Sequence, residues 1–243
     1  MPLNKNIIKE NFSKSAANYD QSANIQRQML EKVFSLVDHE YQTILDVGCG
    51  TGALVKLLAD KYPSSQIVGI DFAPGMIKCA NLKIIKPNVK FAVEDGEKLP
   101  FEPAKFDLVV SSAALQWMDY RAGIKEAVRV LKPGGKFIFA TFGPRTLQEG
   151  RRAGLSVNTF PAQSDLEQTL QQCFKAVNLQ SEVVIHKYAN IFELFKYLKE
   201  IGARYPASSK NNGLLTKNKL LSMFPVSDSG IEVSYEILYG VCN

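Results

Sequence analysis

Residues 45–52 read LDVGCGTG, and this segment indicates the fold of the 243-residue chain. It ends a short apolar run and opens a helical pattern, which is the context in which a glycine loop binds a ligand. Gly48, Gly50 and Gly52 permit positive φ angles and carry no Cβ, so a ligand can lie directly against the backbone. The loop alone is compatible with NAD, a flavin or S-adenosylmethionine.

Short apolar runs alternate with helical patterns on both sides of this loop. Strands are predicted at residues 43–48, 66–71, 89–93, 106–112 and 136–142, and helices at residues 51–62, 74–85 and 119–131. The strand segments are rich in Val, Ile and Phe, as is typical of buried parallel strands. The alternation predicts an open, doubly wound α/β sheet, in which ligands bind beyond the carboxyl ends of the strands.

An antiparallel strand pair is predicted late in the sequence. Residues 181–188 (SEVVIHKY) and 231–241 (IEVSYEILYGV) alternate apolar and polar side chains, as strands with one solvated face do. Added to the five parallel strands, this pair gives a mostly parallel, seven-stranded sheet.

The remaining segments are predicted to be mainly helical. Residues 4–37 indicate two helices broken around residues 18–20 (Asn-Tyr-Asp). We expect a single domain over residues 1–243, with an N-terminal helical lid at residues 1–40. Residues 143–225 are interpreted in part as cap insertions over the strand ends, because a simple crossover does not need them.

Composition excludes several classes of protein. Hydrophobic residues make up 46% and charged residues 22%, which is ordinary for a globular chain and excludes wholesale disorder. No apolar run approaches the roughly 18 residues of a membrane span, and the N-terminus lacks a secretory apolar region. We therefore expect a cytoplasmic protein with no membrane partner. The four cysteines form no CxxC pair and the two histidines have no neighbouring ligand partner, so no metal is expected.

Basic residues are concentrated in the predicted cap. The whole chain carries 29 Lys and Arg against 24 Asp and Glu. Residues 143–225 alone carry 11 Lys and Arg against 6 Asp and Glu. This excess predicts a docking face for an acidic partner, with an ordinary solvated surface as the alternative. Nucleic acid is not expected as a partner, because the Lys and Arg residues are dispersed and the isoelectric point near 8.9 is not extreme.

Acidic residues at the strand ends discriminate between the possible cofactors. Asp71 closes the second strand 19 residues beyond Gly52, where a carboxylate can accept both ribose hydroxyls of an adenosine. A dinucleotide fingerprint would have glycine in place of Ala53. Asp46 suits a cationic amino group better than a phosphate, which favours S-adenosylmethionine. Glu94 and Asp95 follow the third strand, and an acid there is a candidate acceptor for the adenine amino group.

As a set, the motifs of residues 43–142 resemble the class I S-adenosylmethionine-dependent methyltransferases. They are LDVGCGTG, IDFAPGMI, EDGEKLPF, FDLVVSS and LKPGGKF. The resemblance implies that the glycines pack on the methionine moiety, that Asp71 binds the ribose, that Phe72 and Met76 flank the adenine and that Asp95 binds its amino group. The cofactor-binding residues expected in full are Tyr19, Gln26, Asp46, Gly48, Cys49, Gly50, Gly52, Asp71, Phe72, Met76, Asp95, Gly96 and Ser111.

The flanking segments narrow the resemblance. They are NFSKSAANYDQSANIQRQM (11–29), SSAALQWMD (111–119), ATFGPRTLQE (140–149), FKYLKEIGA (195–203) and SYEILYGV (234–241). Together they resemble the malonyl-[acyl-carrier-protein] O-methyltransferases of early biotin synthesis. That resemblance implies methyl transfer from S-adenosylmethionine to the free carboxylate of a malonyl thioester on acyl carrier protein or coenzyme A. The products are the malonyl methyl ester and S-adenosylhomocysteine, and an acidic carrier protein suits the basic cap.

Such a reaction needs few catalytic side chains. A carboxylate is already ionised near pH 7, so no general base is required. Catalysis then depends on in-line placement of the oxygen and the methyl carbon with water excluded. The catalytic candidates are Tyr19, Gln116, Trp117, Arg145 and Arg204. Tyr19 is the first of these, as a hydroxyl-bearing lid residue, while Arg151 and Arg152 are further candidates for pairing with the malonyl carboxylate or with carrier acids.

Three other functions remain open on the sequence. The first is a methyltransferase that acts on another small carboxylic acid or on a ring carbon, although ring-carbon methylation usually needs a base. The second is a non-catalytic module that binds the cofactor or a carrier protein. The third is a nicotinamide oxidoreductase, which Ala53 and the lack of a Tyr/Lys or His catalytic pair disfavour.

Overall fold

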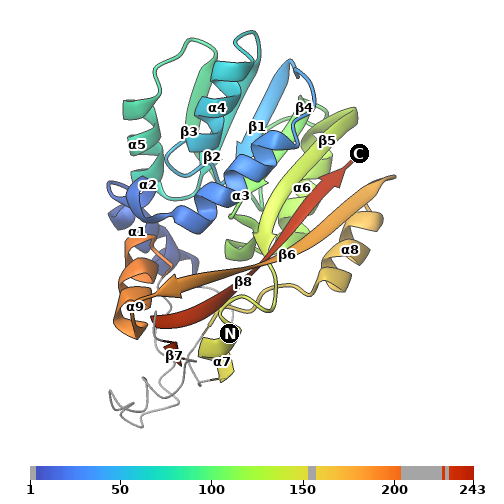
Figure 1. The fold of residues 1–243 in the computed structure, drawn as a ribbon. Coiled ribbons are helices and arrows are strands. Elements are labelled where there is room, and N and C mark those ends of the chain that lie inside the picture. The colour runs from blue at the N-terminus through green and yellow to red at the C-terminus, as the bar shows by residue number, and fades with distance from the viewer. Residues whose placement is uncertain (1–3, 153–156, 204–225, 228–229) are drawn as a thin grey trace.

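One continuous sheet with helices on both faces makes up the core of the computed structural model, which describes residues 4–152, 157–203, 226–227 and 230–243 (Figure 1). The strands are β1 (Thr43–Val47), β2 (Gln66–Asp71), β3 (Val89–Val93), β4 (Phe106–Ser112), β5 (Leu131–Phe142), β6 (Val177–Tyr188), β7 (Val226–Ser227) and β8 (Gly230–Cys242). Their order is β3-β2-β1-β4-β5-β8-β6, and β7 pairs with β8. The first five are parallel, while β8 runs antiparallel to β5 and β6. The predicted sheet is confirmed, and the two-residue β7 extends it.

The helices are distributed over the two faces of the sheet and around the ends of the strands. They are α1 (Lys5–Ser15), α2 (Tyr19–Ser22), α3 (Asn24–Ser35), α4 (Ala53–Lys61), α5 (Pro74–Lys83), α6 (Tyr120–Val130), α7 (Gln148–Arg152), α8 (Gln163–Gln171) and α9 (Ile191–Glu200), with a 3-10 turn η1 (Leu115–Trp117). None of these helices has both the length and the apolar character that crossing a membrane requires, within the described residues.

Burial on both faces explains why the parallel strands are almost continuously apolar. Ile44 of β1 packs with Met29 and Val33 of α3, while the next residue, Leu45, packs on the opposite face with Ile124 of α6. Both strand residues are fully buried. Since successive side chains of a strand point to opposite faces, a strand covered on both sides needs apolar residues at every position.

The fifth strand begins earlier than its pattern predicts. Phe106 pairs with Leu131, and the next pair in the register joins Leu108 to Lys136. The residues between Leu131 and Lys136 therefore bulge out of the ladder, and Gly134 adopts a φ of +77° there. The segment between the predicted helix at 119–131 and the predicted strand at 136–142 is thus an irregularity inside β5, because Leu131 already pairs with β4.

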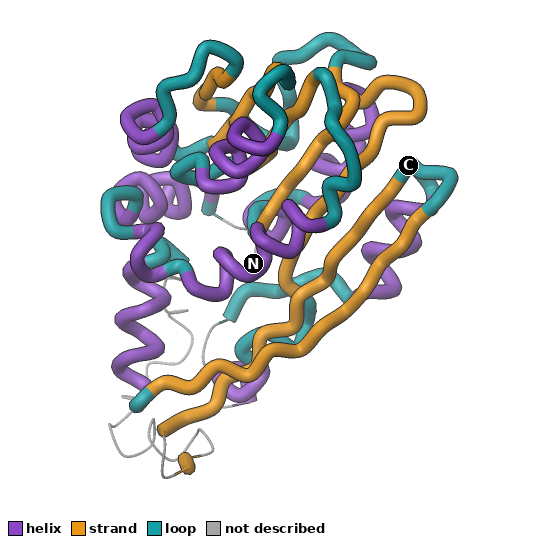
Figure 2. Tube along the Cα trace, turned by 45° about the horizontal axis from the view of Figure 1, so that its top comes forward, coloured by secondary structure: helices purple, strands orange, loops and turns teal. Residues whose placement is uncertain are grey.

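The predicted cap is only partly found above the strand ends. Leu166 and Leu170 of α8 pack on the sheet face that also holds α6, so α8 covers a face of the sheet, which corrects the interpretation of that part of residues 143–225. Helix α9 does lie beside α2. Figure 2 shows the long β6–β8 pair reaching from the labelled C-terminus to the start of α9. Residues 204–225, with Arg204, lie outside the described residues.

Candidate cofactor and substrate site

The glycine loop is fixed by the end of β2. The backbone N–H groups of Gly48 and Cys49 both donate to the carbonyl oxygen of Ile70, each at 2.8 Å. The N–H of Gly50 donates to Oδ2 of Asp71 at 3.0 Å. These bonds hold the backbone of the loop in a fixed position beyond the carboxyl ends of β1 and β2.

The three glycines are required for different reasons. A Cβ on Gly48 would lie 2.2 Å from Cβ of Ala114, so this glycine permits the close approach of the segment after β4. Gly50 has a φ of +56°, which favours glycine, and a Cβ there would meet nothing within 4 Å, so the loop borders open space at that point. A Cβ on Gly52 would lie 2.5 Å from Cδ1 of Ile84, and Gly52 therefore serves helix packing. Of the three, Gly48 and Gly50 line the pockets described next.

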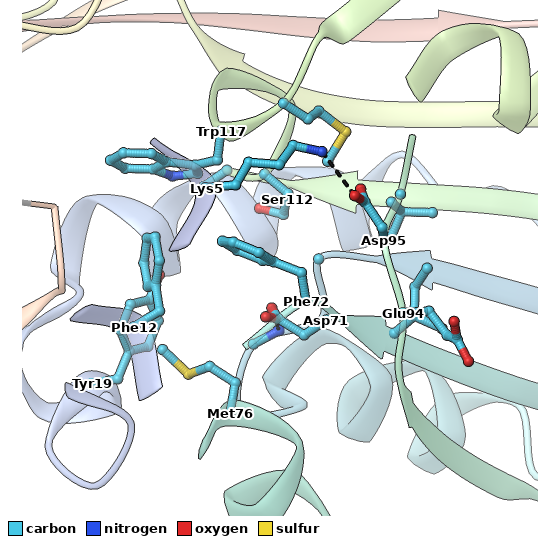
Figure 3. A pocket seen from close by; sticks show the side chains of 18 residues that line it. Lys5, Phe12, Tyr19, Asp71, Phe72, Met76, Glu94, Asp95, Ser112 and Trp117 are labelled. Carbon is cyan, nitrogen blue, oxygen red and sulfur yellow. Dashed lines mark hydrogen bonds and ion pairs between the residues drawn. The ribbon is translucent and has the colours of Figure 1, made fainter. Parts of the chain in front are cut away.

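A pocket walled by aromatic rings opens beside this loop, and we call it the aromatic pocket (Figure 3). The predicted site residues that line it are Tyr19, Gly48, Gly50, Asp71, Phe72, Met76, Asp95, Gly96 and Trp117. Phe12 of α1, which the sequence analysis did not select, lies among their rings, 6.3 Å from Phe72 and 5.1 Å from Trp117 between centroids. A planar ligand ring fits such a wall.

Asp46 is a buried carboxylate without a partner. It is 1% exposed, and neither of its carboxylate oxygens has a hydrogen-bond partner in the part of the chain that the structure describes. Burial, helped by the nearby charge of Asp71, raises the pKa of Asp46 to about 8. An unpaired buried charge is costly, so this position suits a ligand that brings a cation. Asp46 lines a second pocket, the loop pocket, together with Gln26 and Cys49.

Asp71 lies in the wall of the aromatic pocket with part of its bonding capacity used. Its Oδ1 accepts from the N–H of Ala73 at 2.8 Å and its Oδ2 from the N–H of Gly50 at 3.0 Å. Burial raises its pKa to about 6, against the effect of these two backbone bonds. Each carboxylate oxygen retains a further lone pair that can accept a hydroxyl of a ribose.

Asp95, the predicted acceptor for the adenine amino group, is engaged by the N-terminal helix. Nζ of Lys5 lies 2.8 Å from Oδ2 of Asp95 (Figure 3). The same Nζ lies 2.7 Å from Oε1 of Glu97. Burial opposes ionisation of Asp95, but the hydrogen bonds from Lys5 and from the backbone N–H of Glu97, together with the charges of Lys5 and Lys9, keep the pKa of Asp95 below its usual value. The start of α1 is thus tied to the loop after β3.

A second pair of contacts fixes helix α2, which follows α1, through Asp20. The Thr51 hydroxyl donates to Asp20, and Nζ of Lys83 lies 2.6 Å from Oδ2 of the same residue. Tyr19, the neighbour of Asp20, consequently lines the aromatic pocket, the loop pocket and a third, apolar pocket. Burial raises the pKa of Tyr19, so its hydroxyl stays protonated at neutral pH.

The apolar pocket adjoins the aromatic pocket and shares Phe12, Tyr19, Ala113 and Trp117 with it. Its other lining residues are Gln26, Gln116, Phe142, Thr146, Leu147, Phe160, Leu198, Ile201, Ala203 and Tyr235. The wall that the structure describes contains no charged side chain. Gln116 is fixed in it, because Nε2 donates to the carbonyl of Ala113 at 2.7 Å and Oε1 accepts from Thr141 at 3.1 Å.

Two expectations for the site are corrected by the structure. The Ser111 hydroxyl donates to the carbonyl of Val47 at 2.8 Å, away from all three pockets, whereas Ser112 lines the aromatic and loop pockets. Oγ of Ser112 is buried and has no partner among the described residues. Arg145 donates to the buried Glu236 from its backbone N–H at 2.8 Å and from Nε at 2.9 Å, and it lines none of the pockets.

Arg151 and Arg152 are not in the pocket walls either. Arg151 donates to the carbonyl of Pro144 at 2.7 Å, which stabilises the segment leading into α7. Arg152 lies 3.5 Å from Oε1 of Gln148 at the surface. Arg204 lies outside the described residues. Within those residues no cluster of three His, Cys, Asp or Glu side chains can hold a metal ion.

Comparison with known proteins matches this chain to methyltransferases. Residues 45–139 match the family described as a methyltransferase domain. Malonyl-[acyl-carrier protein] O-methyltransferase 2 of Ilyobacter polytropus is 33% identical over 98% of this chain and 97% of its own length. The Malonyl-[acyl-carrier protein] O-methyltransferase of Hahella chejuensis is 33% identical over 99% of this chain and 90% of its own length.

A solved structure with the same fold holds S-adenosyl-L-methionine. It is phosphoethanolamine N-methyltransferase 2 of Haemonchus contortus, 17% identical, with a TM-score of 0.57 over 95% of this chain and 57% of that chain. At this level of identity the likeness shows the fold alone. The class I methyltransferase fold that the motifs predict is therefore confirmed.

Proposed function

The chain belongs to the malonyl-[acyl-carrier protein] O-methyltransferases, and we propose from this membership how its pockets perform the reaction. The enzyme transfers a methyl group from S-adenosylmethionine to the free carboxylate of a malonyl thioester. Its acceptor is malonyl-acyl carrier protein, and malonyl-coenzyme A carries the same acyl group. The ester primes pimeloyl and biotin synthesis, because it masks a charge that is costly to desolvate during chain elongation. A carrier-bound biosynthetic substrate implies a cytoplasmic location.

The aromatic and loop pockets fit S-adenosylmethionine. The carboxylate of Asp46, which lacks a protein partner, would receive the ammonium group of the amino-acid moiety. Asp71 would accept the ribose hydroxyls, and Phe72 and Met76 would flank the adenine in the aromatic wall. Asp95 would bind the adenine amino group if Lys5 moves aside.

The apolar pocket would hold the malonyl group. When bound, S-adenosylmethionine supplies a methyl carbon that an oxygen nucleophile can attack without a metal or a base. The carboxylate is already ionised, so the protein has to orient it and exclude water. Phe12 and Trp117, which separate the two pockets, exclude water at the point where acceptor and donor meet. Tyr19 stays protonated there and would donate a hydrogen bond to the carboxylate.

The observation that supports this arrangement best is the wall shared by the aromatic and apolar pockets. On one side of it lies the aromatic pocket, which adjoins the loop pocket with the unpartnered Asp46. On the other side lies the apolar pocket, whose described lining carries no charged side chain. A malonyl carboxylate in the apolar pocket would therefore meet the methyl group of the cofactor at this shared wall. The reaction needs no further group, since the carbon–oxygen bond forms as the carbon–sulfur bond breaks.

Mass spectrometry of malonyl-acyl carrier protein incubated with the enzyme and S-adenosylmethionine tests the function. The expected result is the gain of one methyl group that an esterase removes. A Tyr19→Phe variant should methylate more slowly while it binds the cofactor normally. If malonyl-acyl carrier protein gains no mass with the wild-type enzyme, although calorimetry confirms that this enzyme binds the cofactor, malonyl-acyl carrier protein is refuted as the acceptor.

A further inference from the structure

The outer face of α9 combines aromatic and basic side chains. Phe192, Phe195, Lys196 and Lys199 are spaced so that they form one stripe along the helix, which we call the α9 stripe. The two phenylalanines are 49% and 37% exposed, and the side chain of Lys196 is 73% exposed. Large aromatic side chains and cations at the surface are typical of sites where another protein docks.

The two acidic residues of α9 contact neighbouring groups of the same protein. Glu193 accepts a hydrogen bond from the backbone N–H of Ala189 at the start of the helix. Glu200 accepts from the Ser22 hydroxyl at 2.9 Å, on the flank that faces α2. Glu200 also lies 3.8 Å from Nζ of Lys196, and such an exposed pair contributes little, so Lys196 can still meet a carboxylate of a partner. Lys196 and Lys199 belong to the α9 stripe, whereas Glu193 and Glu200 lie on its flank.

The opposite face of α9 forms part of the proposed substrate site. Leu194 and Tyr197 are buried, and the Tyr197 hydroxyl donates to Oε1 of Gln26 at 3.1 Å. Leu198 and Ile201 line the apolar pocket. One helix thus separates solvent from the pocket that would hold the malonyl group. A protein docked on its outer face lies next to the place where its acyl group has to enter.

We propose that the α9 stripe is the docking surface for the acidic carrier protein that bears the malonyl thioester. The inference rests on the proposed function and adds the surface to it. Acidic residues of the carrier would pair with Lys196 and Lys199, and an apolar side chain of the carrier would cover Phe192 and Phe195. Charge complementarity of this kind raises the association rate and becomes weaker with salt.

Charge reversal at the two lysines tests the proposal. The variant Lys196→Glu/Lys199→Glu is compared with Lys32→Glu/Lys125→Glu, which changes the net charge equally on exposed positions of α3 and α6. Methyl transfer is measured to malonyl-acyl carrier protein and to malonyl-pantetheine, the same acyl arm without the carrier. We expect the KM for the carrier-bound substrate to rise about tenfold with kcat unchanged. Both parameters for malonyl-pantetheine should stay the same, as should all parameters of the control variant.

Two further measurements make the test specific. Added salt should raise the KM of the wild-type enzyme for the carrier-bound substrate and change that of the α9 variant much less. Phe192→Ser/Phe195→Ser should raise the same KM several-fold without a charge change.

The outcomes separate this proposal from the proposed function. An active wild-type enzyme with equal KM changes for both substrates, or with none, overturns the docking surface alone. Dimerisation that is lost in the α9 variant, with an unchanged KM, would assign the stripe to a second copy of the chain. A wild-type enzyme that methylates neither substrate overturns the proposed function and the docking proposal with it.

Discussion

Replacing Asp46 by Asn should abolish a proton release that accompanies cofactor binding. The carboxylate is buried and unpaired, and its pKa lies at about 8. At pH 7 a group with that pKa is about nine-tenths protonated, and it ionises when a ligand ammonium binds against it. An α-amino group with a pKa of about 7.7–8.0 takes up about 0.1 proton on binding. Wild-type protein should therefore release about 0.8 proton per cofactor bound at pH 7.

The Asp46→Asn variant keeps the shape of the side chain and loses the charge. It should release no proton and take up about 0.1. Loss of a charged hydrogen bond costs about 1.5–3 kcal/mol, so the dissociation constant for S-adenosylmethionine should rise roughly 10- to 100-fold.

Titration calorimetry at pH 7 in phosphate and in Tris measures both quantities, because the two buffers differ in ionisation enthalpy. Asp60→Asn, an exposed position on α4, is the control and should match the wild type. Equal proton release by wild type and Asp46→Asn would refute the assignment of the ammonium to this carboxylate.

The same variant has a defined effect on stability. The folded-state pKa of Asp46 is raised from 3.8 to about 8, so the protonated form favours the folded state. That contribution is fully present below pH 4 and is lost as the pH rises through about 8. Without cofactor, Asp46→Asn should therefore exceed the wild type in melting temperature, with a difference that grows between pH 5 and pH 8.

Three other variants test the rest of the site. Asp71→Asn should weaken S-adenosylmethionine binding about tenfold or more in calorimetry, since an amide cannot accept the ribose hydroxyls and both backbone donors; an unchanged affinity would contradict its ribose role. Lys5→Met should accelerate cofactor association several-fold in stopped-flow fluorescence, because it unties α1, whereas Lys14→Met on the same helix removes only an exposed pair and should not. Gly75→Ala places a Cβ 2.4 Å from the carbonyl oxygen of Ser13 in α1. This overpacking should lower the melting temperature by several degrees. A melting temperature equal to that of the wild type would show that α1 does not pack against Gly75.

The sequence predicts the parts of this structure that depend on local pattern. Buried parallel strands need apolar residues at every position, so β1, β2 and β4 are recognisable without knowledge of their neighbours. The glycine loop and the acids at the strand ends are equally local signals, because the chain order of a doubly wound sheet places them at one edge. The pocket residues Asp46 and Asp71 follow from that placement.

Long-range partners are the part that the sequence does not predict. Arg145 looks like an available anion receptor until β8 places Glu236, 91 positions away, against it. Lys5 meets Asp95 across 90 positions for the same reason. Ser111 and Ser112 are equivalent in the sequence, and the alternation of β4 assigns one to the interior and the other to the pockets.

The position of β8 in the sheet constrains the order in which the chain can assemble. It lies between β5 and β6, and its register with β6 runs over all 12 residues from Val177 to Tyr188. During synthesis, β5 leaves the ribosome long before the strand that must cover its edge. The emerging chain therefore carries an open parallel sheet whose exposed edge can pair with other chains. Strand β8, which covers this edge, also places Glu236 against Arg145 and Tyr235 in the wall of the apolar pocket. One step therefore protects the sheet from aggregation and completes this part of the pocket.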